Sequence, residues 1–226
     1  MIIELIGLPG SGKTYIANQI IDKVYNKRAI NVTEWSRTTF EGRAIKKIIY
    51  LMSNVCPEIK NYKDNIYRIV GSRYPKSLFG LYDDFENCID MFSVTLYTER
   101  KYLKKSGVYL FDEGSLHSIS KLYGDFDIES DVVIRLVQYC LKVLDIKSDQ
   151  IIFNHISVDD DIKSIKMRNR NACRFDRLSD EHLGKILTRY YQSCEIINNL
   201  TGAINIERNE PNDEKMLKIK RLIKSE

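Results

Sequence analysis

The segment with the clearest chemical meaning is Gly7-Leu8-Pro9-Gly10-Ser11-Gly12-Lys13-Thr14, which fits the pattern G-x-x-x-x-G-K-[ST] at every fixed position. Glycines in this pattern allow positive φ angles and let successive backbone N–H groups converge on phosphate oxygens. A helix that begins near Lys13 would add the partial positive charge of its amino terminus. A turn that binds nothing would leave Lys13 buried without an anion, at a high cost. The segment therefore predicts a phosphate-binding loop.

Within this loop we assign separate roles to the side chains. Lys13 is expected to reach the β and γ phosphates of a nucleoside triphosphate, and the hydroxyl of Thr14 is expected to contact Mg²⁺. The residues assigned to nucleotide binding are Gly7, Pro9, Gly10, Ser11, Gly12, Lys13 and Thr14.

An acidic pair, Asp112-Glu113, follows the apolar run Val108 to Phe111. A buried strand that ends in carboxylates brings them to the carboxyl edge of a parallel sheet, where ligands bind. We predict that Asp112 holds Mg²⁺ directly or through water, beside Thr14. The alternative is that Asp112 caps the helix that follows.

Glu113 admits two chemical roles. It could activate a water molecule, as in an ATP hydrolase, or accept the proton of a substrate hydroxyl, as in a phosphotransferase. The sequence leaves both roles open.

Four arginines lie within ten residues of one another near the end of the chain: Arg168, Arg170, Arg174 and Arg177. Planar guanidinium groups suit the negative charge of a phosphoryl group in transfer. We predict a lid over residues 166–178 that closes over the nucleotide. The alternative is a solvated basic patch paired with Asp176 and Asp180.

Five short apolar runs alternate with stretches of helical period, which predicts repeated β-α units and a parallel sheet. The expected strands are Ile2 to Ile6, Ala29 to Thr33, Val108 to Phe111, Gln150 to Asn154 and Ala203 to Glu207. Two helices are expected from apolar stripes over 132–144 and 183–197. The length and this alternation predict one domain over residues 1–226.

Residues 38–103 form a long connection between the second and third expected strands, so they must carry structure of their own. Apolar spacing predicts one helix around Ile45 to Met52 and another from Phe85 that continues toward Leu103. Between them, Pro57 and Pro75 are interpreted as breakers.

Taken together, the chain resembles the P-loop kinases of the nucleoside and nucleotide kinase type. The resemblance rests on the Gly7 to Thr14 loop, the strand before Asp112-Glu113-Gly114, the arginines of 168–177 and the order of the strands. It implies a three-layer α/β fold with a five-stranded parallel sheet in the order 2-3-1-4-5. It also implies ATP and Mg²⁺ as cofactors, a helical insertion at 38–103 that binds the phosphoryl acceptor, and ATP contacts from Arg168, Arg170 and Arg174. Many members carry Asp-Arg where this chain has Asp112-Glu113, which leaves acceptor class and base open.

On the acceptor side, Glu34 follows the second expected strand and is a candidate base, although an exposed loop glutamate is an equal alternative. Arg37, Arg43 and Arg100 are candidates for an acceptor phosphate or are helix-surface charges. Trp35 stacks on a base or belongs to the core. Arg208 and its neighbour Asn209 are expected to border the adenine.

Composition narrows the function classes. A hydrophobic fraction of 43% with only 4 prolines describes a globular chain, and its apolar runs are too short to cross a membrane. A net charge of +4 is too small to argue for nucleic-acid binding, although basic residues alternate with tyrosines between Lys60 and Lys76. The 5 cysteines form no C-x-x-C pair and the amino terminus lacks a secretory leader, so we expect a cytoplasmic protein without disulfides or zinc. The 3 histidines show no metal-like spacing.

These observations favour an ATP-dependent phosphotransferase that moves the γ-phosphate of ATP to a small molecule, nucleoside or nucleotide. An ATPase switch in which Glu113 activates water is the second hypothesis, and a non-catalytic nucleotide-binding regulator is the third. The acceptor and the oligomeric state are not defined by the sequence.

Overall fold

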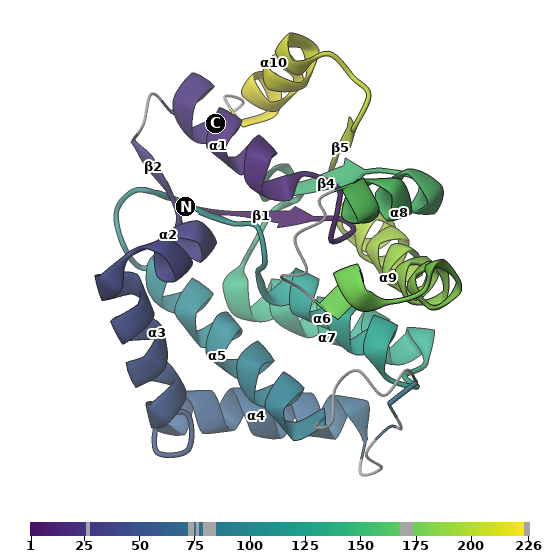
Figure 1. The fold of residues 1–226 in the computed structure, drawn as a ribbon. Helices are drawn as coiled ribbons and strands as arrows, with labels where there is room; N and C mark the ends of the chain where they lie inside the picture. The colour runs from purple at the N-terminus through teal and green to yellow at the C-terminus, as the bar shows by residue number, and fades with distance from the viewer. Residues whose placement is uncertain (26–27, 72–74, 76, 79–84, 168–173, 224–226) are drawn as a thin grey trace.

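The computed structural model describes residues 1–25, 28–71, 75, 77–78, 85–167 and 174–223, without the side chains of 174 and 221–223 (Figure 1). Its centre is a five-stranded, all-parallel sheet in the order β2-β3-β1-β4-β5. The strands are β1 (Ile2–Ile6), β2 (Ala29–Asn31), β3 (Val108–Phe111), β4 (Ile151–His155) and β5 (Ile204–Glu207). The predicted parallel sheet and its strand order are confirmed.

The strand β2 ends two residues earlier than predicted, because Asn31 caps a helix. Its side-chain Oδ1 accepts a hydrogen bond from the backbone N–H of Glu34 at 3.2 Å, which starts α2 (Val32–Thr38) at once. Val32 and Thr33 therefore belong to a helix, and Glu34 lies in its first turn.

Helices cover both faces of the sheet and make three layers (Figure 1). On one face, α1 (Lys13–Lys23) and α10 (Asn212–Ile223) pack against Ile3, Leu5 and Ile206. On the other face lie α5 (Phe85–Leu103), α6 (Ser115–Asp125), α7 (Ser130–Leu144) and α9 (Asp180–Thr201). The apolar residues of β1 are fully buried, which makes β1 the centre of the core.

Residues 38–103 contain three helices among those described: α3 (Phe40–Met52), α4 (Pro57–Val70) and α5. The helix α4 was not predicted. Pro57 was interpreted as a breaker, but it occupies the first turn of α4, where proline is favoured because its missing N–H has no helical partner. Ile59, Tyr62 and Ile66 then form the buried face.

The second half of the chain completes the fold with α8 (Val158–Met167) and two short 3-10 helices, η1 (Ser148–Gln150) and η2 (Arg174–Arg177). The apolar stripes predicted on α7 and α9 are buried, apart from a few partly buried members. Among the described helices, none combines the length and the apolar character that a membrane span requires.

Arg189 joins α9 to the carboxyl end of α6. Its guanidinium donates to the carbonyl oxygens of Tyr123 at 2.9 Å and Phe126 at 3.0 Å, and it lies 4.4 Å from the centre of the Tyr123 ring. The last carbonyls of a helix lack intrahelical partners, so Arg189 supplies a donor to the carbonyl of Tyr123. The carbonyl of Phe126 accepts from Arg189 and also from the backbone N–H of Ile128 at 2.9 Å.

We expect Arg189→Met to lower the free energy of unfolding by about 1–3 kcal/mol, because partly buried carbonyls lose charged donors. Urea denaturation measures this change. Arg135→Met on α7 is the matched control, since Arg135 pairs with Asp131 on the exposed surface. Equal losses in both variants would contradict the assignment.

Candidate active site

The glycine-rich loop leads from β1 into α1 with the backbone geometry that its glycines allow. Gly7 has φ 143° and Gly12 has φ 91°. A Cβ atom on Gly7 would lie 2.6 Å from the backbone oxygen of Asn154, and one on Gly10 would lie 2.0 Å from Oδ1 of Asp161. Gly7 and Gly10 therefore have no room for a side chain. Gly7 and Gly12 also need glycine because their φ angles are positive.

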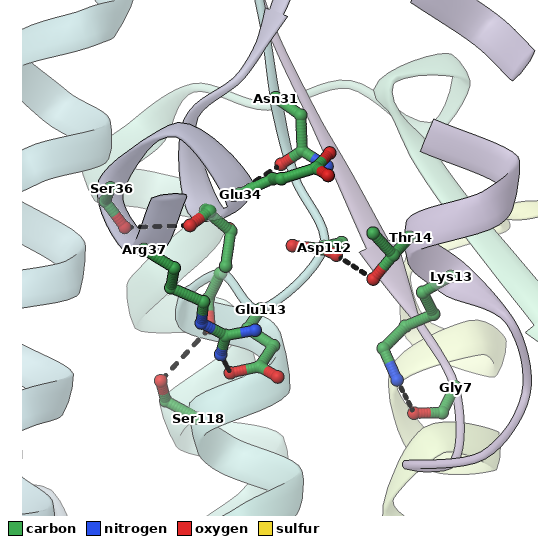
Figure 2. Close-up of polar contacts among 12 residues, drawn as sticks. Gly7, Lys13, Thr14, Asn31, Glu34, Ser36, Arg37, Asp112, Glu113 and Ser118 are labelled. Atoms are coloured by element: carbon green, nitrogen blue, oxygen red, sulfur yellow. Dashed lines mark hydrogen bonds and ion pairs between the residues drawn. The ribbon is translucent and has the colours of Figure 1, made fainter. Parts of the chain in front are cut away.

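Lys13 spans this loop from inside. Its Nζ donates to the carbonyl oxygens of Gly7 at 2.9 Å and Leu8 at 2.8 Å (Figure 2). The side chain is buried, and burial lowers the pKa of the ammonium group, while the carboxylate of Glu113 acts in the opposite direction. The loop carbonyls therefore hold a desolvated cation beside the positions where phosphates would bind.

Asn154 at the end of β4 is a site residue that the sequence reasoning missed. Its side-chain amide donates to the backbone oxygen of Ser11 at 2.7 Å, which fixes the middle of the loop to the sheet. Asn154 is buried within a strand of apolar residues, and a lone polar residue in such a run is the signal that could have identified it.

Thr14 and Asp112 meet as predicted. The hydroxyl of Thr14 donates to Oδ2 of Asp112 at 2.5 Å (Figure 2). Oδ1 of Asp112 is buried and has no hydrogen-bond partner within the described part of the chain. Asp112 accepts none of the hydrogen bonds that the backbone N–H groups of Ser115 and Leu116 donate at the start of α6; Glu99 and Glu4 accept them.

The pair fits a magnesium ion in its donor set. Mg²⁺ prefers oxygen ligands and is commonly bound through one or two protein oxygens together with substrate phosphates. A buried carboxylate oxygen without a partner, next to a hydroxyl, supplies such oxygens. Among the residues described, no cluster of three or more His, Cys, Asp or Glu side chains suited to a metal occurs.

Glu113 is paired with Arg37, which comes from α2 (Figure 2). Both side chains are roughly half exposed, with relative exposures of 43% and 49%. Arg37 thus reaches the end of β3, whereas Arg43 lies exposed on α3 and Arg100 lies on α5.

Glu34 is partly buried in the first turn of α2. Because β2 and β3 are neighbours in the sheet, Glu34 and Asp112 follow adjacent strand ends (Figure 2). Trp35, the next residue, is partly buried.

The arginines predicted for the lid fall largely outside the described residues. This applies to Arg168 and Arg170 and to the side chain of Arg174 at the start of η2. Arg208 follows β5 and is exposed; its guanidinium donates to the hydroxyl of Ser164 on α8, and its backbone N–H donates to the carbonyl of His155 at 3.0 Å. Arg208 therefore lies at the carboxyl edge of the sheet.

Two buried glutamates, Glu4 of β1 and Glu99 of α5, contact the start of α6, close to Asp112 in the sequence. The sequence analysis did not identify them. The backbone N–H of Ser115 donates to Glu99 Oε1 at 2.9 Å, while that of Leu116 and the hydroxyl of Ser115 donate to Glu4 at 3.0 Å and 2.9 Å. Burial raises the pKa of Glu4 to about 7, and burial with the charge of Glu4 raises that of Glu99 well above its usual range. A charged residue inside the apolar run Ile2 to Ile6 was the available signal.

The comparison with solved structures identifies the fold. No protein-family model matches the chain, and no curated protein matches it. A deoxyadenosine kinase from M. mycoides with bound dATP matches with a TM-score of 0.56 and 16% identity, covering 100% of both chains. The same kinase with the products dCMP and a flexible dCDP, and with dCTP, matches with TM-scores of 0.55 and 0.52 and identities of 14% and 16%, again over both full chains. The chain therefore has the P-loop kinase fold.

The raised pKa values of the buried glutamates predict how stability depends on pH. Above the ordinary glutamate pKa of 4.5 the unfolded chain has released the proton of Glu99, whereas the folded chain still holds it. The free energy of unfolding therefore falls as pH rises from 4.5 toward the raised pKa of Glu99, by about 1.4 kcal/mol per pH unit for each retained proton. Glu99→Gln removes this contribution and keeps the shape.

We expect Glu99→Gln to be more stable relative to the unmodified chain at pH 8 than at pH 5, as measured by urea denaturation at both values. Glu86→Gln, on an exposed position in the first turn of the same helix, serves as the control. Parallel pH curves for Glu99→Gln and the unmodified chain would show that Glu99 is ionised in the folded state.

Proposed function

We propose that this protein is an ATP-dependent nucleoside kinase, which transfers the γ-phosphoryl group of ATP to a hydroxyl group of a nucleoside. The observation that carries the proposal is the contact of Thr14 with Asp112 beside the buried Lys13, at the carboxyl edge of a parallel sheet. The fold shared with deoxyadenosine kinases supports a nucleoside as the acceptor.

The loop would bind the triphosphate. The loop leads directly into the amino end of α1, and free backbone N–H groups at a helix amino end favour anions. Lys13 would exchange the two loop carbonyls that it now contacts for phosphate oxygens, which costs little because the cation is already desolvated.

Thr14 and Asp112 would hold Mg²⁺, which supplies charge neutralisation at the β and γ phosphates. For this Thr14 must release its hydrogen bond to Asp112, so that both oxygens become available. The lid arginines, Arg168, Arg170 and Arg174, would add positive charge, and Arg208 would border the adenine.

Glu34 would be the base on the acceptor side. Its position after β2 places it at the same sheet edge as Asp112, and α2 leads directly into the helices of 38–103, which we propose bind the acceptor. A carboxylate within hydrogen-bond reach of the acceptor hydroxyl can take its proton during transfer.

The pairing of Glu113 with Arg37 favours a kinase over an ATPase switch. Arg37 occupies a carboxylate oxygen that a glutamate orienting an attacking water would need to have free. Arg37 instead suits an acceptor that is itself polar or anionic, with Glu113 keeping it in place.

The acceptor is tested by measuring ADP formation with ATP and Mg²⁺ and, one at a time, deoxynucleosides, ribonucleosides, nucleoside 5′-monophosphates and sugars. We expect deoxynucleosides to stimulate ADP formation most strongly. Stimulation by monophosphates alone would move the assignment to a nucleotide kinase.

In the same assay Lys13→Ala should lower kcat/KM by about 10²–10³, because the γ-phosphate loses its main side-chain cation. Glu34→Gln should lower kcat by about 10²–10⁴ with a smaller change in the KM for ATP, because the base acts only in transfer. Circular dichroism checks that both variants fold, and Lys23→Ala, at the exposed end of α1, is the control. Full activity of Lys13→Ala would refute the assignment of the loop.

Glu113→Gln separates the two chemistries. For the kinase we expect slow phosphate release without acceptor in both the unmodified chain and the variant, and retained acceptor-dependent transfer within about tenfold. Steady phosphate release that needs no acceptor and disappears in Glu113→Gln would establish the ATPase switch. Nucleotide binding without either reaction would establish a regulator.

A further inference from the structure

We propose that Glu4 and Glu99 are positioning residues for the proposed kinase, which hold the start of α6 and thereby fix Asp112 against the phosphate-binding loop. The inference rests on the proposed function in one respect, namely that Asp112 holds Mg²⁺. Its basis is the arrangement of hydrogen bonds around the segment 112–114.

Glu4 holds this segment at both ends. In the sheet it is the register partner of Phe111, the residue before Asp112. Through its side chain it accepts hydrogen bonds from Ser115 and Leu116, the first residues of α6. Only three residues lie between these two attachments, so the backbone that carries Asp112 has little freedom to move.

The start of α6 has no local cap. Gly114 occupies the capping position and has no side chain. The N–H groups of Ser115 and Leu116 donate instead to carboxylates from α5 and β1. A serine or aspartate at the capping position would satisfy a helix without burying two acids. Glu4 accepts from Ser115 and Leu116 and, unlike a local cap, also joins α6 to the central strand β1.

Gly114 makes the close approach possible. A Cβ atom there would lie 2.3 Å from Oε1 of Glu99 and 2.4 Å from Oε2 of Glu4. Both oxygens lie close to the same point, so the two carboxyl groups lie close to each other. Oε2 of Glu99 has no hydrogen-bond partner among the residues described, so a proton held there could be donated to Glu4.

Within the described part of the chain, the causes of the raised pKa values of Glu4 and Glu99 include no lysine or arginine charge. The titratable neighbour on α7 is Cys140, and burial followed by the charges of Glu4 and Glu99 raises the pKa of its thiol well above the usual value, so it stays neutral. The amino end of α6 is then the positive group that faces the pair. Keeping a negative charge in the core is costly. Its retention at the amino end of α6 is therefore consistent with a need to hold this helix end firmly.

The test measures the affinity for ATP by calorimetry, in EDTA and in Mg²⁺, without any acceptor. The ratio of the two affinities reports on Asp112, whereas the EDTA value reports on the loop alone. In Glu4→Leu and Gly114→Ala we expect this ratio to fall by about tenfold or more, as for other residues that orient metal ligands, while the EDTA affinity is retained. Glu4→Gln, which keeps an acceptor and the shape, should stay within about threefold of the unmodified chain.

Leu96→Ala is the matched control, because Leu96 is equally buried on α5, one turn before Glu99, but bonds no group of α6. It should lower stability and leave the magnesium ratio unchanged. Hydrogen exchange of the Ser115 and Leu116 amides in the ligand-free protein gives a second readout, with faster exchange expected in Glu4→Leu and Gly114→Ala.

Several results would overturn the proposal. The first is an unchanged magnesium ratio in Glu4→Leu or, if that variant does not fold, in Gly114→Ala. The second is an equal loss of this ratio in Leu96→Ala, and the third is unchanged exchange of the Ser115 and Leu116 amides. The fourth is an unmodified chain whose affinity for ATP does not change with magnesium. A chain that shows the expected magnesium ratios but phosphorylates no acceptor would refute the proposed function and leave the positioning role in place.

Discussion

The hydrogen bond between Thr14 and Asp112 is the contact that organises the candidate site before any ligand binds. It joins the loop after β1 to the end of β3, and these two strands are neighbours only because the chain crosses the sheet in the order β2-β3-β1-β4-β5. The parallel arrangement brings every strand end to one edge, so that residues distant in the sequence share a small region. Each further site residue is placed relative to this contact by the strand that precedes it.

Several buried ionisable groups lie around the same contact. Lys13, Asp112, Glu4 and Glu99 are all buried within or directly behind the site. Burying ionisable groups opposes folding, and here the costs are reduced by backbone groups: loop carbonyls for Lys13 and the amino end of α6 for the glutamates. Such local costs are a common property of sites that must be organised before a ligand binds.

The sequence predicted the sheet, its order through the family resemblance, and the meeting of Thr14 with Asp112, because each follows from a local pattern: apolar runs, a glycine-rich loop, and acids after a buried strand. It did not predict α4, because Pro57 has opposite meanings in the middle and in the first turn of a helix. Nor did it predict Asn154, Glu4 and Glu99, whose roles depend on contacts with residues such as Ser11 and Ser115 that no local pattern relates to them.

The pairing of Arg37 with Glu113 has a consequence for the acceptor. α2 carries both Arg37 and Glu34, so any movement of α2 relative to β3 changes the distance of the candidate base from Asp112 and breaks or makes the ion pair at the same time. Since both members of the pair are half exposed, its net contribution is about 0–1 kcal/mol, small enough for a bound acceptor to replace it. An acceptor that takes over the hydrogen bond between Arg37 and Glu113 would therefore also set the position of Glu34. Acceptor binding and the geometry of proton transfer would in this way be controlled by one short helix.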